Sequence, residues 1–177
     1  PIRYRNPTSV FTDVDRDYWD PRVMPHICED DIPLNDNLCV LGSLKTQPTR
    51  KRPLNGREQS GGSKSVIVGH TRLHLKPIAT PSNRLPKLLM STGACTVANY
   101  TDSSAGYDGT EHHKISAIIV HVKGKKFLPR QIIACEDGSF IDLDIEMKDG
   151  KPHKAPRAQC LATGDLHGVN HDPCAVA

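Results

Sequence analysis

Short runs of alternating apolar and polar residues, each closed by a turn signal, constrain the fold of this chain more than any other feature. Residues 115–121 alternate in this way, and the glycine-containing turns at 123–126 and 136–138 separate them from two further runs. Turn signals between period-two runs are typical of antiparallel strands joined by hairpins. The sequence therefore predicts an antiparallel β-meander over residues 114–145.

Glycine and proline are frequent enough to exclude a fold built from long helices. The chain has 13 glycines and 14 prolines in 177 residues, which favours short strands joined by turns. An apolar run predicts a buried strand at 38–46, and residues 65–79 alternate like strands around a glycine. Residues 85–92 form another apolar stretch. Residues 1–37 and 99–113 are polar and lack periodicity, so we expect irregular segments there. The expected fold class is α+β, mainly β.

A basic, glycine-rich segment lies between the first two predicted strands. Residues 47–64 should form a mobile loop, because the segment is too polar to pack. Clustered Lys and Arg attract backbone phosphates, and the formal net charge of +3 permits a nucleic-acid partner. A solvated loop without a partner is the alternative. The candidate nucleic-acid-binding residues are Arg50, Lys51, Arg52, Arg57 and Lys64.

Cysteine usage and hydropathy bear on the compartment. The 6 cysteines include no C-x-x-C pair and are irregularly spaced, which favours reduced thiols over a disulfide framework. No apolar run approaches the roughly 20 residues that a membrane helix needs. We therefore expect a cytoplasmic protein with no membrane partner.

The sequence Gly164-Asp165-Leu166-His167 follows a run of small and apolar residues at 157–164, which predicts a strand that delivers Asp165. Side chains two residues apart on an extended strand project to the same side, so Asp165 and His167 could share one metal ion. Mixed oxygen and nitrogen ligands suit Mn, Fe or Zn better than Ca. The alternative is a turn with a capping Asp and a surface His.

This motif resembles the first metal motif of the calcineurin-like metallophosphoesterases. The resemblance implies a two-metal centre with Asp165 and His167 as ligands, and a divalent cofactor, Mn or Mg. It also implies two domains, a β-rich one over 1–155 and the opening strand of an α/β metallophosphoesterase domain over 156–177, incomplete in this chain. The family's later Gly-Asp-x-x-Asp and Gly-Asn-His motifs are absent. The Gly-His-Thr-Arg-Leu-His sequence at 69–74 is similar to the family's closing Gly-His-x-His, with two inserted residues and out of order.

A second resemblance covers more of the chain. The chain is similar to a group of tailed-phage proteins in several segments. These are residues 92–100, the pair His112-His113, and the acidic end of the meander at 137–144, followed by Gly-Asp-Leu-His. Members of that group are metallophosphoesterase-type enzymes of DNA metabolism. The resemblance implies that His112 and His113 lie in a polar loop facing the substrate, as candidate catalytic residues. Two exposed loop histidines are the alternative.

Two functions of different classes follow. The first is a divalent-metal-dependent phosphoesterase that acts on nucleic acid, with DNA favoured, as in a phage nuclease. The second is a non-catalytic β-rich module that binds nucleic acid or assembles phage structure with other copies. A homo-oligomer is compatible with both.

Overall fold

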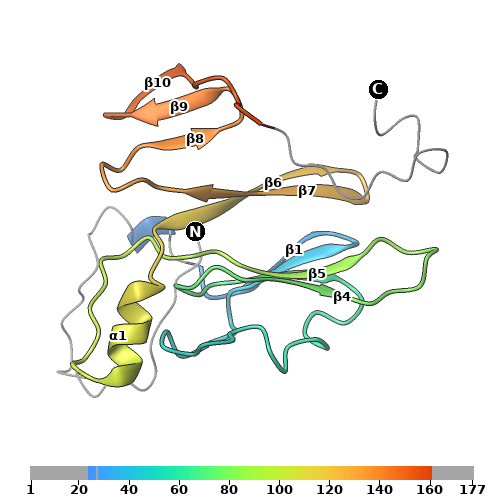
Figure 1. The fold of residues 1–177 in the computed structure, drawn as a ribbon. Coiled ribbons are helices and arrows are strands. Elements are labelled where there is room, and N and C mark those ends of the chain that lie inside the picture. The colour runs from blue at the N-terminus through green and yellow to red at the C-terminus, as the bar shows by residue number, and fades with distance from the viewer. Residues whose placement is uncertain (1–23, 27, 161–177) are drawn as a thin grey trace.

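The structure is a computed structural model that describes residues 24–26 and 28–160 (Figure 1). Its described part is mainly β, with a five-stranded sheet in the order β1-β2-β3-β5-β4, a hairpin of β6 and β7, and a three-stranded sheet in the order β10-β9-β8. The bounds are η1 Met24–His26, β1 Asp31–Asn35, β2 Leu38–Leu41, β3 Ser65–Val68, β4 Leu75–Ile78, β5 Lys87–Ser91, α1 Ser104–Glu111, β6 Ser116–Lys123, β7 Lys126–Ile133, β8 Phe140–Asp142, β9 Ile145–Lys148 and β10 Lys151–Lys154.

The five-stranded sheet has a parallel centre. Strand β3 pairs in parallel with β2 and with β5, while β1 and β4 pair antiparallel at the two edges. Central parallel strands are covered on both faces and read as continuous apolar runs, which is why β3 is buried at every position. The predicted strands at 38–46 and 65–79 are confirmed, and the apolar stretch at 85–92 forms β5. Their parallel pairing was not predicted.

Each face of this sheet carries its own group of apolar side chains. One face is covered by the segment between β2 and β3, and the other by the β6–β7 hairpin, which contributes Ile118, Val120 and Phe127. The buried members of the first face are Cys39, Leu54, Val66, Val68 and Leu89, and those of the second are Leu38, Val40, Ile67 and Met90.

The segment at 47–64 packs, so the prediction that it is too polar to do so is wrong. Pro53 and Leu54 at its centre are fully buried, and successive hydrogen-bonded turns run along it. The buried Lys87 ammonium of β5 donates to the carbonyl oxygens of Glu58, Ser60 and Gly62, at 2.6, 3.2 and 2.5 Å. A lysine ammonium has three donors, and all of them hold this segment. Two apolar side chains and one buried cation thus anchor a segment that is otherwise polar, which does not fit a mobile loop.

The polar stretch at 99–113 contains helix α1, which corrects the prediction of a loop. Ser103 caps it, because its side-chain oxygen accepts a hydrogen bond from the Gly106 amide at 3.1 Å. Gly106 and Gly109 lower the helix propensity and hide the element in the sequence. Both are buried, and a Cβ at Gly106 would lie 1.9 Å from the Thr101 carbonyl oxygen.

The predicted meander is present, but it is divided between two sheets. Strands β6 and β7 pair over their full length, and the predicted turn at 123–126 is confirmed. The predicted single run at 139–145 is broken into β8 and β9, because Leu143 adopts a positive φ of 58° and reverses the chain. Strand β1 forms in the segment 1–37 that was expected to be irregular, which corrects that prediction. Of the strand predicted over 157–164, residues 157–160 are not in a strand, and the remainder lies outside the described residues.

Candidate functional site

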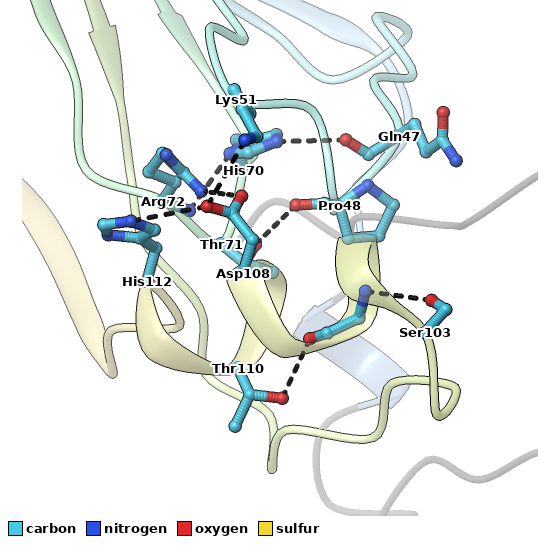
Figure 2. Close-up of polar contacts among 11 residues, drawn as sticks. Gln47, Pro48, Lys51, His70, Thr71, Arg72, Ser103, Asp108, Thr110 and His112 are labelled. Atoms are coloured by element: carbon cyan, nitrogen blue, oxygen red, sulfur yellow. Dashed lines mark hydrogen bonds and ion pairs between the residues drawn. The ribbon is translucent and has the colours of Figure 1, made fainter.

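A polar cluster lies where the parallel strands end. His70, Thr71 and Arg72 directly follow β3, the middle strand of the parallel centre. Ligands of open sheets with parallel strands bind outside the carboxyl ends of those strands. Figure 2 shows these residues meeting the segment that begins at Gln47 and the side of helix α1. Three parts of the chain that are distant in sequence therefore converge at this edge.

One carboxylate lies at the centre of the cluster. The Asp108 side chain, on α1, is 2.5 Å from Arg72 Nη2, 3.7 Å from His112 Nε2 and 4.0 Å from Lys51 Nζ (Figure 2). The Asp108 and Arg72 side chains are only 22% and 14% exposed, so this pair is more than a surface contact. The ion pair joins α1 to the strand end and fixes the guanidinium.

Further basic groups surround the ion pair. Burial lowers the pKa of His74, and repulsion from Arg72, His112 and Arg52 lowers it further, against a backbone hydrogen bond with Lys51 that raises it. These groups are near enough to influence one another, and they outnumber the single carboxylate. We call the set the Arg72 cluster: Lys51, Arg52, Arg72, His74, Asp108 and His112. Its charge balance favours an anionic ligand.

His70 links the end of β3 to the segment that begins at Gln47. It is 1% exposed, its Nε2 lies 3.1 Å from the Gln47 carbonyl oxygen, and its Nδ1 accepts the Arg72 amide at 3.0 Å. These contacts assign the proton to Nε2, and burial lowers the His70 pKa, so the ring is neutral. Thr71 adds a hydrogen bond from its hydroxyl to the Pro48 carbonyl at 3.2 Å. The two contacts place Lys51 beside Arg72.

The predicted nucleic-acid-binding residues separate into different places. Lys51 contacts Asp108, and Arg52 acts on His74 through its charge, so both belong to the Arg72 cluster. The Arg50 guanidinium turns back to the Asn55 carbonyl at 3.0 Å. Arg57 Nε is buried and has no hydrogen-bond partner among the described residues. Lys64 precedes β3 and so lies at the opposite end of the sheet.

The two candidate catalytic histidines have different environments. His112 ends α1 at the edge of the Arg72 cluster, with its side chain 47% exposed. Both ring nitrogens of His113 are engaged, Nδ1 with the Tyr100 hydroxyl at 2.9 Å and Nε2 with the Thr96 carbonyl at 2.6 Å. His113 therefore fastens the 96–100 segment, and only His112 faces the cluster. A catalytic role for either stays a prediction.

The predicted metal ligands Asp165 and His167 lie outside the described residues. Within residues 24–26 and 28–160, no group of three or more His, Cys, Asp or Glu side chains is arranged to hold a metal ion. His70 uses both ring nitrogens for backbone contacts, and His74 lies among cations that repel a metal. The described residues alone thus do not fit the metal centre that the resemblance implies.

Sequence reasoning missed Arg72 and Asp108, the central ion pair of the site. A signal was available for Arg72, because polar residues that directly follow a buried strand mark the carboxyl edge of a parallel sheet. Reading it required knowing that the strands are parallel. No sequence signal singles out Asp108, since the helix that carries it was not predicted.

Comparison with known proteins finds a phage relative. The chain is 24% identical over 167 residues to Protein A1 of Escherichia phage T5, covering 90% of this chain and 30% of the relative. This similarity agrees with the expected phage relationship. The chain spans under a third of that relative's length. No family model and no solved structure matches the chain. In the described part, no helix has the length and apolar character to cross a membrane.

Proposed function

We propose that this chain is part of a divalent-metal-dependent phosphoesterase that acts on nucleic acid, and that the Arg72 cluster holds the substrate phosphate. The observation that supports it is the convergence of cationic side chains from three segments at the carboxyl end of β3. A phosphodiester carries one negative charge and presents acceptor oxygens, which match such a group of donors.

Arg72 is the principal phosphate ligand in this proposal. Its planar guanidinium presents donors in a rigid fork that matches two phosphate oxygens. Asp108 holds one side of that fork, which reduces the freedom that Arg72 would lose on binding. The burial that lowers the pKa of His74 keeps its ring neutral, so it offers a hydrogen bond without adding charge.

The catalytic part of the proposal depends on other groups. A bound divalent ion would polarise the phosphoryl oxygen and activate water, and Asp165 and His167 are the candidate ligands. The described residues supply binding and orientation. In this proposal His112, whose half-exposed side chain lies at the edge of the cluster, is the candidate group that gives a proton to the leaving oxygen.

The test is cleavage of DNA by the natural gene product that contains this chain, assayed with Mn and with a chelator. Arg72→Gln should lower kcat/KM by at least about tenfold, the loss of one charged contact. Arg84→Gln is the matched control, because Arg84 is an exposed arginine in the turn before β5.

Asp165→Asn separates catalysis from binding. It should abolish turnover and leave DNA affinity nearly unchanged, because the Arg72 cluster does not include it. Cleavage that survives the chelator would contradict the metal dependence. Binding that depends on Arg72 without any cleavage would replace the enzyme with a non-catalytic nucleic-acid-binding module.

A further inference from the structure

A second group of cations lies at the other end of the molecule. The turn of the β6–β7 hairpin contains Lys123, Gly124, Lys125 and Lys126, and Lys123 pairs directly with Lys126 across the two strands. Figure 1 shows α1 and this turn at opposite ends of the five-stranded sheet. Like charges directly opposite each other in a hairpin are destabilising. The hairpin therefore keeps an arrangement that is unfavourable for its own stability.

The turn is fixed to the sheet by amide hydrogen bonds. Asn35 Nδ2 donates to the carbonyl oxygens of Gly124 and Lys126 at 3.1 and 3.3 Å, and Asn37 Nδ2 donates to that of Lys125 at 2.8 Å. All three bonds hold the backbone and leave the lysine ammonium groups outside. The two asparagines thus present these lysines from a fixed backbone.

Lys64 joins the same corner. Its Nζ lies 3.3 Å from the Asn35 carbonyl oxygen, beside the turn that accepts the hairpin. Among the described residues, Asp36 is the acidic residue in ion-pair contact with these lysines, 3.7 Å from Lys125, with both side chains more than 70% exposed. An ion pair so exposed neutralises little of the charge. We call Lys64, Lys123, Lys125 and Lys126 the Lys corner.

We propose that the Lys corner is a second nucleic-acid contact, which binds backbone phosphates away from the Arg72 cluster. This inference rests on the proposed function in one respect, because both take nucleic acid as the partner. Flexible ammonium groups bind phosphates as point charges and do not read base sequence, so the contact should position the nucleic acid rather than select it.

The strand between the two sites sets their spacing. Lys64 precedes β3 and His70 follows it, six residues apart. At about 3.3 Å per residue this is about 20 Å, or about six phosphates along one strand of a duplex. Affinity should therefore rise with duplex length until both sites are occupied, and then level off.

The experiment measures binding of fluorescent DNA duplexes over a range of salt concentrations. The triple variant K123Q/K125Q/K126Q should flatten the slope of log K against log salt by about 0.9 for each lost contact, about 2 to 3 in all. The matched control is K148Q/K151Q/K154Q, which removes the same charge from exposed lysines of β9 and β10. This control should change the slope by less than about 0.9.

A variant that changes no charge tests the role of Asn35 and Asn37. N35A/N37A removes the three amide hydrogen bonds and leaves every lysine in place. It should weaken DNA binding by about threefold to tenfold, through the freedom that the lysines regain. Circular dichroism identifies a variant that has lost the fold.

Three results would overturn the inference. The first is an equal slope change in the triple variant and its control. The second is a triple variant that binds DNA normally but has lost binding to phosphatidylserine vesicles, which would assign the corner to a membrane. The third is affinity that does not depend on duplex length. Arg72→Gln separates this inference from the proposed function: if it leaves DNA affinity intact while the triple variant weakens it, the phosphate role of the Arg72 cluster fails and the Lys corner stands.

Discussion

The two cationic ends of the sheet are built in different ways. In the Arg72 cluster, the basic groups surround a carboxylate and lie on buried supports, since His70 is 1% exposed and Arg72 14%. In the Lys corner, the three lysines of the hairpin turn are exposed and the backbone beneath them is held, while the Lys64 ammonium contacts the Asn35 carbonyl oxygen. The first arrangement fixes the position of individual charges. The second fixes a surface and leaves the charges free to move.

This difference predicts two kinds of phosphate contact. A fixed guanidinium beside neutral imidazoles suits one phosphate in a defined orientation, as a reaction requires. A rigid turn with flexible lysines suits the backbone of a long polyanion, in any register. Disturbing the supports of the first should therefore damage binding more than disturbing individual charges of the second.

Among these variants, Leu54→Ala should have the largest effect, which is a loss of stability in the segment that supports the Arg72 cluster. Leu54 is 1% exposed in the apolar group beneath the sheet and lies three residues from Lys51. Its truncation should lower the free energy of unfolding by about 2–5 kcal/mol, through lost burial and the cavity left behind. Denaturant unfolding measures this loss, and Leu128→Ala, at a side chain 65% exposed, is the control. Equal losses in the two variants would show that the segment does not depend on Leu54.

Lys87→Met should have the next largest effect. The methionine retains the apolar stem and leaves three carbonyl oxygens without their ammonium donor. The free energy of unfolding should fall by about 1–3 kcal/mol, and amides of the 58–62 turn should exchange faster with solvent. If the amides of residues 58–62 exchange as slowly in Lys87→Met as in the wild type, Lys87 does not anchor this segment.

The two acidic residues offer a direct comparison of the ends. Asp108→Asn keeps a side-chain oxygen that can still accept a hydrogen bond from the Arg72 guanidinium and removes the negative charge. It should raise affinity for a short phosphorylated ligand about fivefold, since two charges 4 Å apart in water interact by about 1 kcal/mol. Asp36→Asn at the Lys corner should change it by less than about twofold, because that pair is exposed. Titration of both variants with the same oligonucleotide tests this. A larger effect at Asp36 would reverse the assignment of the two ends.

Sequence patterns identified local structure well and long-range pairing poorly. The alternation at 115–121 and the Lys-Gly turn are local signals, and the hairpin formed as predicted. The continuous apolar runs identified the strands of the central sheet, but the same runs are compatible with several pairings. Their parallel order depends on which segments cover the two faces of the sheet. One face is covered by Leu54, which lies in a segment that is otherwise polar.

The candidate site was harder to predict for the same reason. Its central ion pair joins Arg72 to Asp108 across 36 residues and depends on a helix whose glycines conceal it. Lys51 was identified because basic clusters are visible in the sequence, whatever their neighbours. The role of His70 was not visible, since its ring is defined by two backbone contacts that exist only in the fold.

The smallest expected effect is a pH dependence confined to the Arg72 end. Burial lowers the pKa of both His70 and His74 in the folded protein, so the unfolded chain binds more protons as the pH falls through the ordinary histidine range, about 6.5. Their contribution to stability is therefore complete above that range and is lost progressively below it. Unfolding measured from about pH 8 to about pH 5 should show this loss, and His70→Gln should reduce its slope. His153→Gln, on exposed β10, is the matched control for the substitution itself. If His70→Gln keeps the wild-type slope, the acid sensitivity belongs to other groups, and the neutral histidine support of the Arg72 cluster is wrong.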